Sequence, residues 1–142
     1  MQIQNYDNHR RWVFPYHLLM GPAIGFLFVQ SLIHLIHDPR YELSHDILWV
    51  LVSLILGSFF IYVRQFSLKA QDRAIRAEES LRHFLLTGKP LYKELTMQQI
   101  IALRFAGDEE FPGLAKRAAD ESLGSTEIKK AIRSWRADHW RV

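Results

Sequence analysis

The residues of this chain that could bind a metal ion are gathered between two apolar segments. The stretch QSLIHLIHDPRYELSHDILW, which begins at Gln30, contains three histidines and two aspartates. His34 and His37 are separated by three positions and would share one face of a helix. Imidazole and carboxylate ligands suit zinc, iron, nickel or copper, and three neutral histidines with one aspartate would fill a tetrahedral site. The candidate metal ligands are His34, His37, His45 and Asp46, with Asp38 close by in the sequence.

The same residues also have ordinary structural uses. Asp46 is placed as an N-cap or first-turn acid for the segment that follows, and Asp38-Pro39 ends the segment before it. Only His34 lies about one turn inside an apolar run, where ionisable residues are usually functional or paired. The second apolar run has no histidine that could complete a bis-histidine haem site. The simpler interpretation is therefore the polar end of a helical hairpin without a cofactor.

The two apolar runs are long enough to cross a membrane. Residues 18–36 and 47–63 contain no Asp, Glu, Lys or Arg. A helix needs about 20 apolar residues, and at least about 17, to span the hydrocarbon core. We predict transmembrane helices over residues 18–37 and 47–63, joined by an external loop over residues 38–46.

The distribution of basic residues predicts the orientation of this hairpin. The loop has a single arginine against three acidic residues, whereas basic residues flank both outer ends of the hairpin: Arg10, Arg11, Arg64, Lys69, Arg73 and Arg76. By the positive-inside rule both termini are cytoplasmic, including the N-terminal juxtamembrane segment 1–17.

Small residues in the two spans predict how the helices pack. Gly21 and Gly25 form one small-xxx-small pattern, and Ser53 and Gly57 form another. Such patterns let helix backbones approach closely in lipid. An antiparallel pairing would place Gly25 level with Gly57 and bring Gln30 near Ser53 for a hydrogen bond. The alternative use of these residues is homodimerisation.

The helical pattern continues beyond the second span. Residues 64–88 contain no Gly or Pro before Gly88, which predicts a stalk helix that ends there. One apolar stripe runs along it, made of Phe66, Ala70, Ala74, Ala77, Leu81 and Phe84. We expect this stripe to dock on the C-terminal helices of the same chain, with a coiled coil as the alternative.

The C-terminal region, residues 91–142, predicts three short helices. Thr96 and Gln99 have the spacing of a capping box, Pro112 suits a first turn, and Ser125 suits an N-cap. Together with the spans and the stalk, these helices define an all-α fold. The region holds nine Lys/Arg and eight Asp/Glu, so it lacks the basic field of a nucleic-acid-binding domain.

Basic and aromatic residues gather in the last predicted helix, with Ile128, Ile132 and Trp135 on its apolar face. This candidate surface for anionic lipid or a partner comprises Lys129, Lys130, Arg133, Trp135 and Arg136. The alternative is a core helix with a solvated basic side.

Several kinds of chemistry are excluded or unsupported. The chain has no cysteine, which excludes disulfides, zinc–thiolate sites, iron–sulfur clusters and thiol catalysis. No nucleophile with a neighbouring base can be singled out in NYDNHRRWVFPYH, before the first span. The acids of GDEE, residues 107–110, are more simply a helix start than a site. We therefore expect no enzyme activity.

Two motifs carry a resemblance to a known family. QDRAIRAEE follows the second span and IALRFAGDEE lies in the C-terminal region. Together with QNYDNHRRWVFPYH, and with IKKAIRSWRADHWRV at the end, they resemble a bacterial family of small two-span membrane proteins, domain of unknown function 6526. The resemblance covers nearly the whole chain. It implies an inner-membrane protein with a cytoplasmic helical tail, and it brings no catalytic residues.

These observations lead to an expected function and two alternatives. We expect a non-enzymatic scaffold or assembly partner of the bacterial inner (cytoplasmic) membrane, in contact with the lipid bilayer and with either a second copy or another membrane protein. The first alternative is an accessory subunit of an oligomeric transporter or permease. The second is a metal-binding or sensing protein that uses the external histidines and aspartates.

Overall fold

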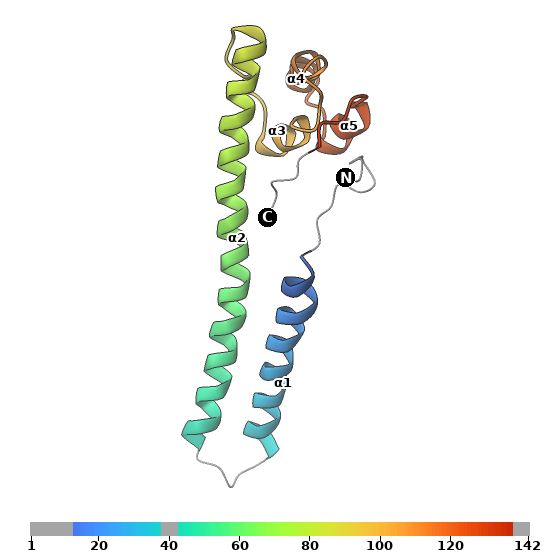
Figure 1. Ribbon diagram of the computed structural model, residues 1–142. Coiled ribbons are helices and arrows are strands. Elements are labelled where there is room, and N and C mark those ends of the chain that lie inside the picture. Colours follow the sequence, from blue (N-terminus) through green and yellow to red (C-terminus); the bar gives the residue numbers. More distant parts are fainter. Residues whose placement is uncertain (1–12, 38–42, 138–142) are drawn as a thin grey trace. The chain divides into compact units, whose positions relative to one another are not determined.

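The computed structural model describes residues 13–37 and 43–137, and this part of the chain is helical (Figure 1). A π-helix, η1 (Pro15–Met20), leads into α1 (Gly21–His37). The other helices are α2 (Leu43–Thr87), α3 (Met97–Leu103), α4 (Phe111–Asp120) and α5 (Ser125–Ala131). The described ranges contain no strand, only an isolated bridge between Ala106 and Trp135. The all-α prediction is confirmed.

The chain forms two compact units. Among the described residues, the hairpin unit comprises residues 13–37 and 43–67, and the C-terminal unit comprises residues 68–137. The α2 helix is unbroken and contributes residues to both units.

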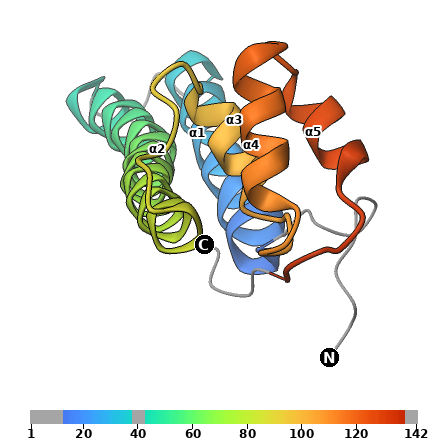
Figure 2. The ribbon, with the colours of Figure 1, turned by 90° about the horizontal axis from the view of Figure 1, so that it is seen from above.

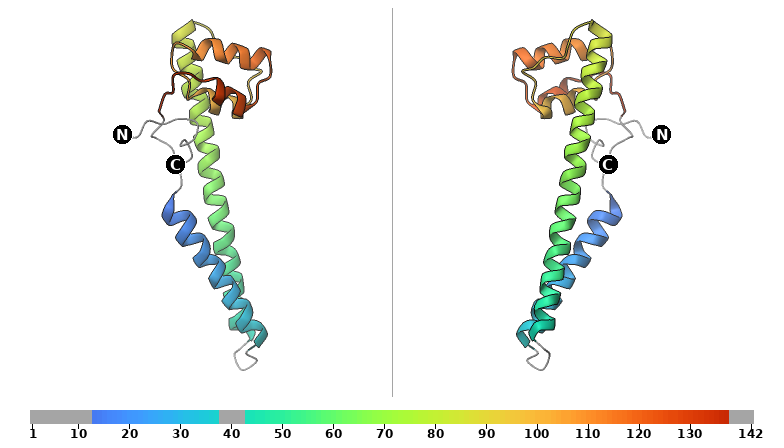
Figure 3. Two further views of the ribbon diagram at one scale, coloured as in Figure 1. Left: turned by 90° about the vertical axis from the view of Figure 1, so that its right-hand side faces the viewer. Right: turned by 90° about the vertical axis from the view of Figure 1, so that its left-hand side faces the viewer.

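In the hairpin unit, α1 lies beside the first part of α2 (Figures 1 and 3). By length and composition, Pro15–His37 and Leu43–Thr87 could each cross a membrane. The α2 helix begins at Leu43 rather than at residue 47. His45 and Asp46, predicted in the loop, are therefore helical. Residues 38–42, and Asp38 with them, lie outside the described part of the chain.

The contact between the two helices uses a different face of α1 from the predicted one. The residues of α1 that are at least partly buried include Gly21, Ile24, Phe28 and Ser31, at alternating spacings of three and four. A Cβ atom at Gly57 would lie 3.8 Å from the Ile24 Cγ2 atom, and one at Gly21 would lie 3.5 Å from the Phe60 Cζ atom. A Cβ atom at Gly25 would have no neighbouring atom within 4 Å. Gly25 was therefore wrongly predicted to pack, because Ile24 occupies the contacting row.

An aromatic contact joins η1 to α2 at the end of the hairpin away from residues 37 and 43. The Tyr16 and Phe60 rings stack with centroids 4.1 Å apart, and the Tyr16 hydroxyl donates a hydrogen bond to the Phe60 carbonyl. The Arg64 guanidinium lies 5.5 Å from the centroid of the Tyr16 ring. The π-helix therefore begins with a side chain fixed against α2.

In the C-terminal unit, α3, α4 and α5 enclose a small core (Figure 2). The predicted capping box is present: the Thr96 amide donates to the Gln99 Oε1 atom at 2.8 Å, and the Gln99 amide donates to the Thr96 Oγ1 atom. The Gln99 Nε2 atom also donates to the carbonyls of Ala118 and Leu123, at 3.2 and 2.9 Å. One glutamine thus caps α3 and ties it to the end of α4. The α2 helix ends at Thr87, and Gly88 has a φ of +69°, which favours glycine.

The face of α2 that joins this core is not the predicted apolar stripe. The buried residues are Ile75, Glu79 and His83, at spacings of four. In the stripe, Leu81 is 59% exposed and Phe84 is 53% exposed. The prediction that the stripe docks on the C-terminal helices is therefore wrong. The junction uses another face of α2, where Ile75 enters the hydrophobic core and polar residues make ion pairs and hydrogen bonds.

The last predicted helix is also shorter than expected. The α5 helix ends at Ala131, and Ile132 is extended, with a ψ of 125°. The Gly107 amide donates to the Ser134 carbonyl, and the Arg136 amide donates to the Phe105 carbonyl, at 2.9 and 2.8 Å. Trp135 therefore does not continue a helical face, because its backbone pairs with the segment after α3.

The hairpin register predicts unequal effects for two glycines of α1. Gly21→Leu should destabilise the hairpin by about 1–3 kcal/mol, because the new side chain meets the Phe60 ring. Gly25→Leu is the matched control and should change stability little. The unfolding midpoint of each purified full-length variant in mild detergent measures its stability. An equal loss of stability in the two variants would contradict this packing.

Candidate functional site

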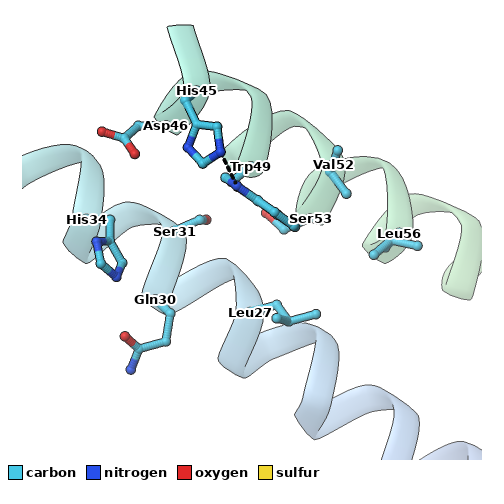
Figure 4. A pocket seen from close by; sticks show the side chains of 10 residues that line it. All are labelled: Leu27, Gln30, Ser31, His34, His45, Asp46, Trp49, Val52, Ser53 and Leu56. Carbon is cyan, nitrogen blue, oxygen red and sulfur yellow. Dashed lines mark hydrogen bonds between the residues drawn. The ribbon is translucent and has the colours of Figure 1, made fainter. Parts of the chain in front are cut away.

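The hairpin unit contains a pocket between α1 and α2 (Figure 4). Its volume is about 370 Å³. The lining residues come from both helices: Leu27, Gln30, Ser31, His34, His45, Asp46, Trp49, Val52, Ser53 and Leu56. Six of these ten residues have polar side chains, but most of the surface that they expose to the pocket is apolar. Such a composition suits a small amphipathic ligand.

Three polar residues of this pocket are buried: Ser31, Asp46 and Ser53. The Ser31 hydroxyl donates to the Phe28 carbonyl and the Ser53 hydroxyl donates to the Val50 carbonyl, both at 2.8 Å. Each serine is therefore satisfied by its own helix. The predicted hydrogen bond between Gln30 and Ser53 is not formed, and the Gln30 amide points away from α2 (Figure 4).

Asp46 is the acidic residue among those that line this pocket, and it is buried. The residue is only 8% exposed, and its carboxylate points toward α1 from the first turns of α2 (Figure 4). The positive end of the α2 dipole favours a negative charge at this position. A buried carboxylate that lines a pocket is a candidate for binding a small cation.

The predicted metal ligands are not gathered around one point. Within residues 13–37 and 43–137, no group of three or more His, Asp or Glu side chains could hold a metal ion. The His37 Nδ1 atom donates to the Ile33 carbonyl at 3.3 Å, on its own helix. The His45 Nε2 atom accepts from the Trp49 indole at 3.3 Å. The described geometry thus gives no support to a metal site made of His34, His37, His45 and Asp46, because two of the rings bond within their own helices.

A second cluster of charges lies in the C-terminal unit, centred on Arg82. Its guanidinium lies 2.9 Å from the Glu79 Oε2 atom and 2.6 Å from the Asp108 Oδ1 atom. It also donates to the Ala106 carbonyl at 2.6 Å and lies over the Phe111 ring, 4.4 Å from the centroid. The side chains of Glu79 and Arg82 are only 6% and 10% exposed. One arginine therefore joins α2 to the segment between α3 and α4.

Glu110 makes a second link within this unit. Its carboxylate accepts the backbone amides of Arg133 and Ser134, at 3.1 and 3.0 Å. The predicted acids of GDEE thus have structural partners: Asp108 binds Arg82, and Glu110 holds the segment after α5. This second role explains why α5 ends early, since the carboxylate binds amides of an extended backbone.

The predicted lipid-facing residues divide between core and surface. The Trp135 ring lies 5.2 Å from the Phe105 ring, and Arg136 lies 3.8 Å from Glu79. Lys130 and Arg133 are exposed, and Lys129 is partly buried. Trp135 and Arg136 therefore hold the C-terminal unit together, so the five residues do not form one uniform surface.

Sequence reasoning missed the roles of Glu79, Arg82, Asp108 and Glu110. Glu79 is in the motif QDRAIRAEE, with Arg82 three residues further on, and the other two acids are in IALRFAGDEE. An acid and an arginine three apart, on the helix face that carries Ile75 and His83, were the available signal. Because this face is largely polar in sequence, hydrophobic periodicity favoured the apolar stripe as the docking face.

Comparison with protein-family models matches residues 1–142 to one family, described as a family of unknown function, DUF6526. No curated protein and no solved structure matches the chain.

The Arg82 cluster predicts a large effect of one charge removal. Arg82→Met should destabilise the C-terminal unit by about 3–5 kcal/mol, because it leaves the buried Glu79 carboxylate without its nearest partner. Arg76→Met, at an exposed position of the same helix, is the control. Amide hydrogen exchange of residues 97–131 in the full chain measures the change. Equal protection in the two variants would contradict the role given to Arg82.

Proposed function

We propose that this chain, which belongs to the DUF6526 family of unknown function, is a non-enzymatic scaffold anchored in the bacterial inner membrane. The hairpin unit is the anchor, and the C-terminal unit is a helical platform on the cytoplasmic side. The platform binds a second copy or another membrane protein. The lipid bilayer is the first partner of the chain.

The exposure of the apolar helices is the observation that carries this proposal. In the most apolar 18-residue windows of the two candidate spans, only 6% and 11% of the residues are buried. Large side chains are open to the surroundings, among them Phe26 at 63%, Ile36 at 71% and Phe59 at 68% exposed. The core helix of a soluble protein would bury most of these side chains. A lipid environment would cover them without a partner protein.

The structural use of the C-terminal charges supports a scaffold over an enzyme. Glu79, Asp108 and Glu110 are bonded to Arg82 or to backbone amides. Their carboxylates therefore have structural roles in the unit, which leaves its outer surfaces for a partner.

Single cysteines test the anchor directly, because the chain has none of its own. In intact cells, Ser44→Cys should react with an impermeant thiol reagent, since it lies at the external end of the proposed hairpin. Lys116→Cys, at an exposed position of α4, should react only after lysis. The reverse pattern would overturn the orientation, and recovery of the chain in the soluble fraction would overturn the anchor.

The buried Asp46 favours a second candidate function, a subunit of a small oligomeric permease. Ionisable residues within spans commonly mark ion or proton pathways. One hairpin is too small to enclose such a pathway, so several copies would have to surround it. Asp46 and the pocket it lines would then lie along the path.

Reconstituted vesicles distinguish this second candidate from the scaffold. A permease should carry proton or monovalent-cation flux above that of empty vesicles, and Asp46→Asn should abolish it. Asp72→Asn, in the C-terminal unit, should leave the flux unchanged. No flux from the unmodified chain would reject the permease.

A further inference from the structure

One face of α2 in the C-terminal unit is apolar and uncovered. Ala70, Ala74, Ala77, Leu81 and Phe84 are all exposed. The core of this unit contacts α2 through Ile75, Glu79 and His83, which lie on the other side of the helix. Docking of α3, α4 and α5 on α2 therefore leaves the apolar face of Ala70, Ala74, Ala77, Leu81 and Phe84 exposed.

The spacing of these exposed residues is that of a coiled coil. From Ala70 to Phe84 the intervals are four, three, four and three, which places the residues at alternating d and a positions of a heptad. We propose that a second copy of this chain covers this face, in a parallel two-stranded coiled coil over residues 70–84. This inference rests on the proposed function, because two copies anchored in one membrane present their stalks in the same direction.

Charge complementarity favours a second copy in this orientation. Arg73 precedes an a position and is therefore a g residue, whereas Glu78 follows a d position and is an e residue. In a parallel pair, a g residue lies opposite the e residue five positions further along the partner. Arg73 of each copy would thus meet Glu78 of the other, giving two ion pairs. An antiparallel pair matches g with g and e with e, and it gives no pair of opposite charge.

Both charges are available for this contact. Arg73 and Glu78 are exposed, and neither takes part in the ion pairs seen among the described residues of the chain. Of the neighbouring charges, Glu79 and Arg82 are already used within the C-terminal unit.

The composition of the face implies weak but specific pairing. Three alanines let the helices approach closely, while Leu81 and Phe84 supply most of the apolar area. The segment is short for an independent coiled coil in solution. Confinement of both copies to one membrane raises their effective concentration, which favours the pairing without new contacts.

Cysteine cross-linking in isolated membranes tests this inference, with Ala77→Cys as the variant and Arg76→Cys as the control. Both positions are exposed on the same helix. A disulfide requires Cα atoms within about 7 Å, which a d position meets across the dimer axis and an outward-facing position does not. Under mild oxidation, dimer from Ala77→Cys should exceed dimer from Arg76→Cys by about tenfold.

Charge reversal then tests the proposed orientation in the Ala77→Cys background. Arg73→Glu alone and Glu78→Arg alone should each lower the cross-linked fraction about twofold, as expected for an exposed ion pair. The double reversal should restore it. Equal cross-linking in all four chains would overturn the parallel pairing.

The outcomes separate this inference from the proposed function. Dimer at residue 77 and not at residue 76 supports the second copy. Absence of dimer, equal dimer at both positions, or cross-linking to a protein of another mass overturns it. Fractionation of the same sample reports the anchor independently: chain in the soluble fraction overturns the membrane proposal whatever the cross-linking shows.

Discussion

The Arg82 guanidinium is the interaction on which the C-terminal unit depends. It binds the Glu79 and Asp108 carboxylates, donates a hydrogen bond to the Ala106 carbonyl, and lies over the Phe111 ring. A planar group with five donors in a rigid fork can bind several acceptors and stack on an aromatic ring at once, a geometry that the compact ammonium of lysine does not offer. The core of α3, α4 and α5 is small, so this shared cation supplies attachment to α2 that apolar burial alone would not provide.

This polar junction has a consequence for the rest of α2. Because ion pairs and hydrogen bonds contribute to the attachment, the apolar stripe of the helix is left free for another contact. A helix that used its apolar stripe for its own core would have nothing left with which to bind a partner. The distribution of faces on α2 thus connects the stability of the C-terminal unit with the proposed scaffold role.

The hairpin unit follows a different principle, in which small and aromatic residues set the approach of two apolar helices. Gly57 accommodates Ile24, Gly21 accommodates Phe60, and Tyr16 stacks on the same phenylalanine. The serines of the interface donate hydrogen bonds to carbonyls of their own helix, so each hydroxyl is satisfied locally. Asp46 is the exception, a buried acid at the start of α2.

The sequence by itself determined the all-α class, the two apolar helices, the end of α2 just before Gly88 and the capping box at Thr96. Each of these follows from local chemistry: hydrophobic runs, a glycine that tolerates positive φ, and a side chain that caps its own helix. Only the tertiary structure decided which face of α2 docks, where α5 ends and which glycine packs. Those outcomes depend on partners distant in the chain. Glu110 binds amides at Arg133 and Ser134, and Arg82 binds Asp108, and no local periodicity encodes either contact.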